Sequence, residues 1–186
     1  MAQPYPHFDC LTRPQDQSRL HLRAETANDE QPIRALLERA FARPAEAQLV
    51  SALRRSANLT LSLVAELSGA IVGHVAISPT SLGEDPSFSC LGLGPLAVDS
   101  TQQSRGIGTA LVWNALQQLR TSSAPAIFVL GDPQYYQRFG FVDAAKRSIR
   151  WEVDTPPGTF LALELTPGGL RNRQGTVRYR PEFFHV

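Results

Sequence analysis

The sequence predicts an α/β (α+β) fold in which helices cover both faces of one mixed sheet, and three observations predict it. Apolar residues recur at helical spacing at 33–41 and 45–55. A strictly alternating run at 59–67 turns back on itself through a Ser-Gly pair, which is typical of a hairpin. A strand at 89–98 then leads through a polar loop into a helix that opens on Gly-x-Gly.

The individual elements follow from their ends as much as from their apolar patterns. Asn28-Asp29 offers an N-cap to the first helix, and Pro44 ends it. Asp132-Pro133 offers another N-cap, with proline at the first helical position. The predicted strands are 20–26, 59–67, 71–78, 89–98, 126–130, 147–153 and 159–165; the further predicted helices are 45–55, 105–120 and 134–139, with a loop at 79–87 and a tail from 166.

Composition and charge fit an ordinary globular protein. Of the 186 residues, 42% are hydrophobic and 19% are charged. A chain of this size buries roughly 70% of its unfolded surface, so it needs neither a disulfide nor a metal to fold. The 18 Lys and Arg nearly balance the 17 Asp and Glu, which leaves a net charge of +1. We therefore expect no nucleic-acid partner and no membrane surface as a partner.

Residues 1–18 are predicted to be a flexible N-terminal extension, and residues 19–186 a single domain. The first 18 residues are polar and rich in Pro and Gln, without the apolar centre of a signal peptide. Cys10 and Cys90 stand in no Cys-x-x-Cys pattern, so no metal site is expected. We interpret both as reduced thiols of a cytoplasmic protein.

The segment 103–109, Gln-Ser-Arg-Gly-Ile-Gly-Thr, carries the clearest functional signal. It joins a strand to a helix start, where backbone N–H groups lack partners inside the helix and the helix dipole adds positive potential. Gly106 and Gly108 let an anion approach the backbone, and Arg105 can add charged hydrogen bonds. We expect a pyrophosphate site. It lacks the Lys-Ser/Thr of a Walker A loop, and Leu111 replaces the third glycine of the Rossmann fingerprint.

Two motifs resemble those of the GNAT superfamily of N-acetyltransferases. Gln103-Ser104-Arg105-Gly106-Ile107-Gly108 is similar to its Gln/Arg-x-x-Gly-x-Gly/Ala element, and Tyr136 to Phe141 resembles its Tyr-x-x-x-Gly-Phe element. The preceding Gly-Asp-Pro-x-Tyr-Tyr is similar to a bacterial subgroup labelled YhbS-like. The resemblance runs roughly from Leu20 to Phe184 and is least specific in the C-terminal third. It implies a GNAT-like mixed, mostly antiparallel central sheet with a splayed strand, here Leu-Gly-Pro-Leu-Ala-Val.

The resemblance also implies acetyl-CoA as co-substrate, without a metal. In the family, the pantetheine arm lies against backbone groups of the splayed strand, and the pyrophosphate lies over the following turn. The backbone N–H of Val98 is our choice for holding the thioester oxygen. The residues implied to bind acetyl-CoA are Leu96, Ala97, Val98, Gln103, Ser104, Arg105, Gly106, Ile107, Gly108, Thr109 and Tyr136.

The resemblance assigns Tyr136 as the catalytic acid that protonates the departing thiolate. A phenol with a pKa of about 10 beside a thiol of about 8.5 can donate a strong hydrogen bond to the developing thiolate. The structural alternative is that Tyr135 and Tyr136 are packing aromatics on a short helix.

The residues leave the general base open. Glu66, His74, Glu84 and Asp85 lie near the predicted acceptor side, and each has a structural alternative. His74 stands in mid-strand, where it is expected as a hydrogen-bonded core histidine, and the acids are expected on solvated surface. A chain of waters is the further alternative that the family allows.

The sequence thus predicts an N-acetyltransferase that moves an acetyl group from acetyl-CoA to an amine of a small molecule or peptide, by direct attack in a ternary complex. We expect the segments 151–154 and 160–165 to shape the acceptor pocket. Two alternatives stay open: a non-catalytic acyl-CoA-binding or sensor module, and a nucleotide-phosphate binder of another class. The chain is expected to be a monomer or a homodimer, since Tyr179, Phe183 and Phe184 can pack on their own domain or on a partner.

Overall fold

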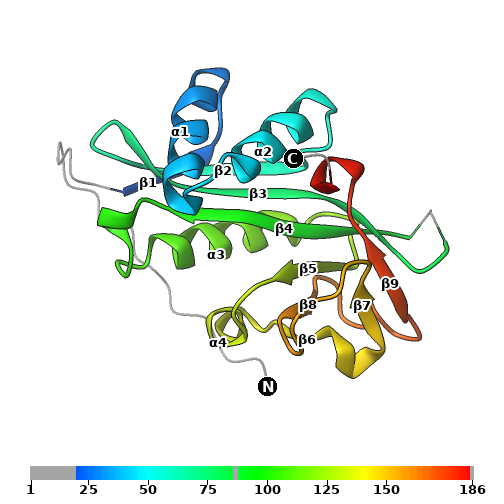
Figure 1. Cartoon of the computed structure of the whole chain (residues 1–186). Helices are drawn as coiled ribbons and strands as arrows, with labels where there is room; N and C mark the ends of the chain where they lie inside the picture. The colour runs from blue at the N-terminus through cyan, green and yellow to red at the C-terminus, as the bar shows by residue number, and fades with distance from the viewer. Residues whose placement is uncertain (1–19, 86–87, 185–186) are drawn as a thin grey trace.

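The computed structural model describes residues 20–85 and 88–184 (Figure 1). The expected extension at 1–18, and Cys10 within it, lie outside these residues. The strands are β1 Leu20–Ala24, β2 Leu61–Leu67, β3 Ala70–Leu82, β4 Ser89–Val98, β5 Ala126–Leu130, β6 Val142–Asp143, β7 Ile149–Trp151, β8 Phe160–Glu164 and β9 Gly175–Arg178. The helices are α1 Glu30–Phe41, α2 Ala45–Arg55, α3 Ile107–Leu119 and the short α4 Pro133–Tyr136; 3₁₀ turns lie at Ala27–Asp29, Ser100–Gln102, Gln137–Phe139, Ala144–Arg147 and Pro181–Phe184.

The sheet is mixed and mostly antiparallel, as predicted. Its described strands follow the order β1-β2-β3-β4-β5-β8-β6, and β9 joins β7 to β3 at the side. The pairs β4–β5 and β7–β9 are parallel, while the other described pairs are antiparallel. The pairing of β9 with the end of β3, at Ser81 and Leu82, brings the C-terminal part of the chain back to the sheet (Figure 1).

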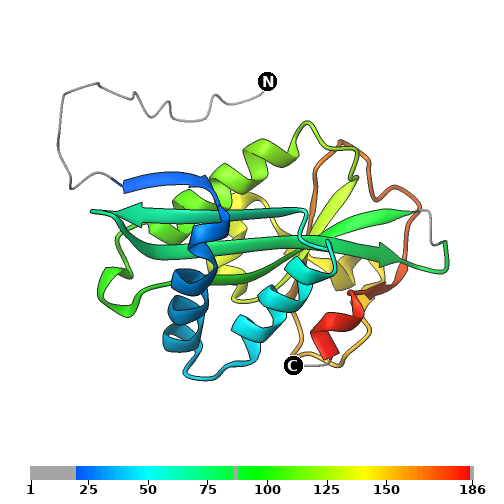
Figure 2. The same ribbon diagram turned by 90° about the horizontal axis from the view of Figure 1, so that it is seen from above.

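Helices cover both faces of this sheet, which also confirms the prediction. Figure 2 shows α1 and α2 on one face and α3 on the other. Leu36 of α1 packs with Val64 and Ala76 of the sheet in one buried cluster. Leu111 of α3 packs with Leu63, the neighbour of Val64, in the cluster on the opposite face. Burial of each such leucine contributes about 1.5–3 kcal/mol, so the two helical layers hold the sheet from both sides.

The predicted loop at 79–87 is partly wrong, because β3 continues through Pro79 to Leu82. On one edge of β3, Pro79 pairs with Leu91 of β4. On the opposite edge, the pairing with β2 reaches only as far as Ile77, so Pro79 lies beyond it. A proline lacks an N–H and is tolerated where one edge of a strand has no partner to receive it. Strand β3 is therefore longer than the proline in its sequence indicates.

Two short strands, β6 and β9, were not predicted. β6 pairs with β8, and β9 pairs with β3 and β7. Neither is long enough to show an alternating pattern, since a strand of two to four residues is recognisable only through its partners. β9 is followed directly by Tyr179, which lines the cavity described below.

Candidate active site

The parallel strands β4 and β5 part beyond their last paired residues, Leu93 and Val129. β4 continues alongside β3 as far as Val98, so the gap opens on the β5 side. The backbone N–H of Asp99 donates to the Val72 carbonyl of β3 at 2.9 Å. Successive N–H groups of a strand point to opposite edges, so the N–H of Val98 points away from β3 and toward the gap.

Helix α3 starts at the end of β4, and Gly106 is its N-cap with φ of 82°. This left-handed conformation suits glycine, which has no Cβ. Among the described residues, no side chain accepts a hydrogen bond from the first turn of α3. Those amides and the helix dipole are therefore available to an anion.

The residues predicted to bind acetyl-CoA fall into two groups. Residues 103–106 are exposed around the start of α3, with Gln103 Nε2 donating to the Val98 carbonyl at 3.2 Å. Arg105 is turned aside, where its Nη1 lies 3.2 Å from Gln102 Oε1. The residues of the second group lie in or near the core. Buried or half-buried are Leu96, Ala97, Val98, Ile107, Gly108 and Thr109.

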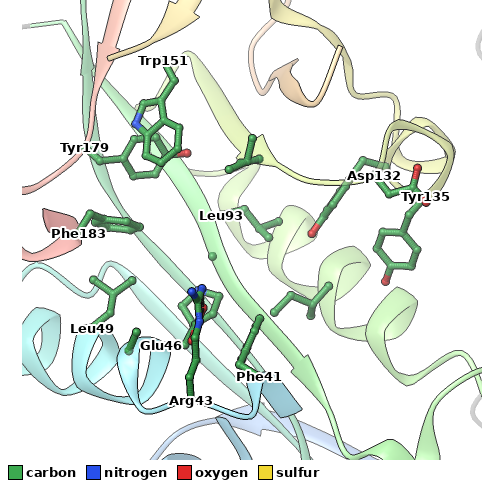
Figure 3. A pocket seen from close by; sticks show the side chains of 16 residues that line it. Phe41, Arg43, Glu46, Leu49, Leu93, Asp132, Tyr135, Trp151, Tyr179 and Phe183 are labelled. Atoms are coloured by element: carbon green, nitrogen blue, oxygen red, sulfur yellow. Dashed lines mark hydrogen bonds and ion pairs between the residues drawn. The ribbon is translucent and has the colours of Figure 1, made fainter. Parts of the chain in front are cut away.

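A cavity of roughly 610 Å³ lies where β4 and β5 part (Figure 3). This volume is within the range of small-molecule sites. Five separate parts of the chain build it: the α1–α2 corner, β4, the end of β5 with α4, the end of β7, and the C-terminal segment. Its lining is Phe41, Arg43, Ala45, Glu46, Leu49, Leu93, Gly94, Pro95, Leu96, Leu130, Asp132, Tyr135, Tyr136, Trp151, Tyr179 and Phe183.

Tyr136 borders this cavity, although only 7% of it is exposed. Its ring lies on Gly131, where an added Cβ would stand 2.4 Å from Tyr136 Cε2. Burial raises the pKa of the Tyr136 phenol, and the neighbouring Tyr135 adds to the effect. The hydroxyl is therefore protonated at neutral pH, which suits a proton donor.

Tyr135 connects α4 to the start of α3. Its hydroxyl oxygen lies 2.8 Å from the position that a Cβ would take on Gly108. The same position is 3.5 Å from a methyl of Val98 and 3.9 Å from a methyl of Leu96. Tyr135 and Leu96 both line the cavity, so the first turn of α3 contacts its lining without being part of it.

The four candidate bases all lie outside the cavity lining. Glu66 is ion-paired to Arg23 at 2.8 Å. His74 is fully buried, with Nε2 2.9 Å from Ser62 Oγ, as expected for a core histidine. Glu84 is exposed, and Asp85 is exposed opposite Arg173.

Two other carboxylates line the cavity instead. Asp132 Oδ1 accepts from the backbone N–H of Gln134 at 2.9 Å, which caps α4 as predicted. Glu46 pairs with Arg43, whose Nε lies 3.0 and 3.1 Å from the two carboxylate oxygens. Sequence reasoning missed Glu46, because an acid in the first turn of a helix after a proline indicates only a favourable helix start.

The segments 151–154 and 160–165 contribute less to the cavity than predicted, whereas the tail contributes more. Trp151 lines the cavity, whereas the residues of β8 do not. Tyr179 and Phe183 pack on their own domain and line the same cavity, while Phe184 is 46% exposed. The sequence shows that the tail is rich in aromatic residues, but it does not show that the tail packs at the cavity.

Residues 20–85 and 88–184 contain neither a cluster of metal-ligand side chains nor a helix that could cross a membrane. In this part of the chain, no group of three or more His, Cys, Asp or Glu is arranged to hold a metal ion. Within the same residues, no helix has the length and apolarity that crossing a membrane requires.

Parallel strands that part beside a bare helix start and a buried phenol define an acyl-CoA-dependent transferase. Residues 21–141 match the acetyltransferase (GNAT) family. The chain belongs to this family of acetyl-CoA-dependent N-acyltransferases.

Its relatives agree with this assignment over most of the chain. The uncharacterized N-acetyltransferase YhbS of Escherichia coli K12 is 38% identical over 164 residues, 87% of this chain and 97% of YhbS. The crystal structure of Escherichia coli YhbS in complex with CoA matches with a TM-score of 0.85 and 37% identity, covering 95% of this chain and 96% of that one. A GNAT family acetyltransferase from Brucella melitensis in complex with acetyl-CoA matches with a TM-score of 0.74 and 35% identity, over 89% and 99% of the two chains.

Proposed function

We propose that this protein moves the acetyl group of acetyl-CoA onto an amine of a small molecule or peptide, by direct attack in a ternary complex. One arrangement carries the proposal. The uncapped start of α3 lies against Tyr135, and both Tyr135 and the buried Tyr136 line the cavity between the parted strands β4 and β5.

The donor site that we propose follows the parted strand and the turn after it. The pyrophosphate binds over 103–109, where the bare amides of α3 begin. The pantetheine arm lies along Leu96, Ala97 and Val98, with the Val98 N–H toward the thioester oxygen. The complexes of Escherichia coli YhbS with CoA and of the Brucella melitensis enzyme with acetyl-CoA support this fit, since both chains share this fold.

Tyr136 acts as the catalytic acid in this proposal. The departing thiolate of CoA needs a proton, and a phenol whose pKa is raised by burial stays protonated at neutral pH and can donate a strong hydrogen bond to the developing thiolate. Such a proton donor contributes about 10²–10⁴-fold to a rate. A cytoplasmic location and a monomeric or homodimeric state stay predictions.

The test compares Tyr136→Phe with Tyr135→Phe, because both remove one hydroxyl from α4. We expect the first substitution to lower kcat about a hundredfold or more with unchanged acetyl-CoA affinity, and the second to lower it much less. CoA thiol release across a panel of amines measures kcat, and calorimetry with acetyl-CoA measures affinity.

Two outcomes contradict the proposal. Tight CoA binding with no turnover of any amine indicates a non-catalytic acyl-CoA-binding or sensor module. Stronger binding of ATP or NAD than of CoA indicates a nucleotide-phosphate binder of another class.

A further inference from the structure

Three aromatic side chains from the C-terminal part of the chain form one side of the cavity. Figure 3 shows these residues, Trp151, Tyr179 and Phe183, across from Tyr135 and Asp132; we call them the aromatic wall. The Trp151 and Tyr179 rings meet edge to face with centroids 5.5 Å apart, and the Tyr179 and Phe183 rings do so at 4.7 Å. This is the favoured geometry of aromatic pairs, so the wall is organised before a ligand binds.

Each end of the aromatic wall is anchored. Trp151 stacks on Phe160 of β8, with centroids 6.3 Å apart. Beside Phe183, the carboxylate of Glu182 accepts hydrogen bonds from Asn58 Nδ2 at 2.8 Å and from the Ser56 hydroxyl, both just beyond the end of α2. The C-terminal turn is thereby tied to α2, and Phe183 is held at the cavity.

The charges of the cavity lining sum to −1. One cation, Arg43, stands against two carboxylates, Glu46 and Asp132. The Glu46 side chain is 12% exposed and pairs with Arg43, so Asp132 carries the negative charge that is left over. A ligand with a single positive charge complements this lining, whereas a polyamine brings charges that find no partner and an anion is repelled.

From the aromatic wall and this charge we propose that the acceptor is a small primary arylalkylamine, a flat apolar ring carrying one ammonium group. The proposal rests on the acetyl transfer proposed above. The ring packs on the aromatic wall and Leu49, and the ammonium faces Asp132, the lining carboxylate that does not pair with Arg43. The cavity of about 610 Å³ must also admit the thioester end of the donor, so the acceptor is small.

The transfer balances without another reactant. The ammonium group first releases one proton to water. The amine nitrogen then forms a C–N bond to the acetyl carbon while the C–S bond to CoA breaks. The leaving sulfur takes the proton of Tyr136, and the second proton lost by the nitrogen restores the phenol. The products are an acetamide, the CoA thiol and one proton.

The first experiment measures kcat/KM for phenethylamine, tryptamine, ethylamine, spermidine and L-lysine at saturating acetyl-CoA. We expect both arylalkylamines to exceed spermidine and lysine by at least tenfold, and the KM for ethylamine to lie at least tenfold above the KM for phenethylamine. A higher kcat/KM for spermidine or for lysine than for both arylalkylamines overturns the proposal.

The second experiment combines substitution with substrate. Phe183→Ala should raise the KM for phenethylamine about tenfold and leave the KM for ethylamine within twofold, because ethylamine has no ring to lose contact. Phe184→Ala is the matched control, since Phe184 lies in the same turn, is 46% exposed and does not line the cavity. Phe183→Leu, which keeps the bulk, should fall between; equal changes for both amines overturn the proposal.

Calorimetry separates this inference from the proposed function. If acetyl-CoA does not bind, both fail. If acetyl-CoA binds and amines turn over, but the ring makes no difference in either experiment, only the arylalkylamine inference fails.

Discussion

The ring of Tyr136 lies directly on the backbone of Gly131, with no room between them for even a methyl group. A Cβ on Gly131 would stand 2.4 Å from Cε2 and 3.1 Å from Cδ2 of that ring. Gly131 follows the last residue of β5 and leads into α4. Because it has no side chain, the phenol ring of Tyr136 can lie against its backbone.

We expect Gly131→Ala to displace Tyr136 and to lower kcat about a hundredfold, because a shift of about 1 Å at a catalytic group can cost that much. The KM for acetyl-CoA should change far less. The measurement is steady-state CoA release. In the Tyr136→Phe background, the same glycine substitution should add almost nothing; a full further loss there would show that it acts through unfolding instead.

The start of α3 offers a second prediction with a matched control. Gly106 and Gly158 have φ of 82° and 77°, and an added Cβ meets nothing within 4 Å at either. Alanine at either position should cost about 1–2 kcal/mol of stability, since both backbones are left-handed. Only Gly106→Ala should weaken acetyl-CoA binding, roughly tenfold, because its methyl would stand among the amides that we propose to bind the phosphates.

Calorimetry with acetyl-CoA and with acetyl-pantetheine, which has no phosphate, measures this effect. The loss should appear for acetyl-CoA alone. Equal losses for both ligands, or an equal loss in Gly158→Ala, would contradict a pyrophosphate site at this turn.

Because His74 is buried, we expect the folded protein to become less stable in acid. Burial lowers its pKa to about 4, although Glu25 Oε2, 3.9 Å from Nε2, opposes this, while Arg54 adds to it. Between pH 6.5 and 4 the unfolded chain binds a proton that the folded chain does not, so stability falls with falling pH. At 1.36 kcal/mol for each pKa unit, the loss reaches about 3 kcal/mol.

Urea unfolding at several values of pH between 7 and 4 tests this, with His74→Gln as the variant that cannot titrate. The variant should lose this part of the pH dependence. A slope equal to that of the wild type would assign the effect to other groups.

Cys90 should be inert in the folded protein. It is fully buried, and burial raises its pKa to about 12, so almost no thiolate exists at pH 8. In a Cys10→Ser variant, whose one thiol is Cys90, we expect no reaction with Ellman's reagent until denaturant is added. Rapid reaction of the folded variant would contradict this burial, and the result also matters for assays that detect the CoA thiol.

Much of the fold was predictable because it depends on short-range patterns. The predicted limits of α2, β4 and β5 agree with the structure residue for residue. α3 begins two residues after its predicted start at Arg105, because Gly106 takes the left-handed conformation of an N-cap. At Pro79 the prediction ended strand β3 too early. Only the neighbouring strands show that the missing N–H of this proline faces an edge without a partner.

The sequence by itself determined the family-like order of most strands and helices, a helix start within two residues of Arg105, and the place of Tyr136 before Gly140. These are local properties, set by periodicity, caps and spacing within a few residues. Only the tertiary structure decided that Glu46 and Phe183 share one cavity and that His74 lies outside it. Such contacts join segments far apart in the chain, and packing between layers, which no local pattern records, selects them.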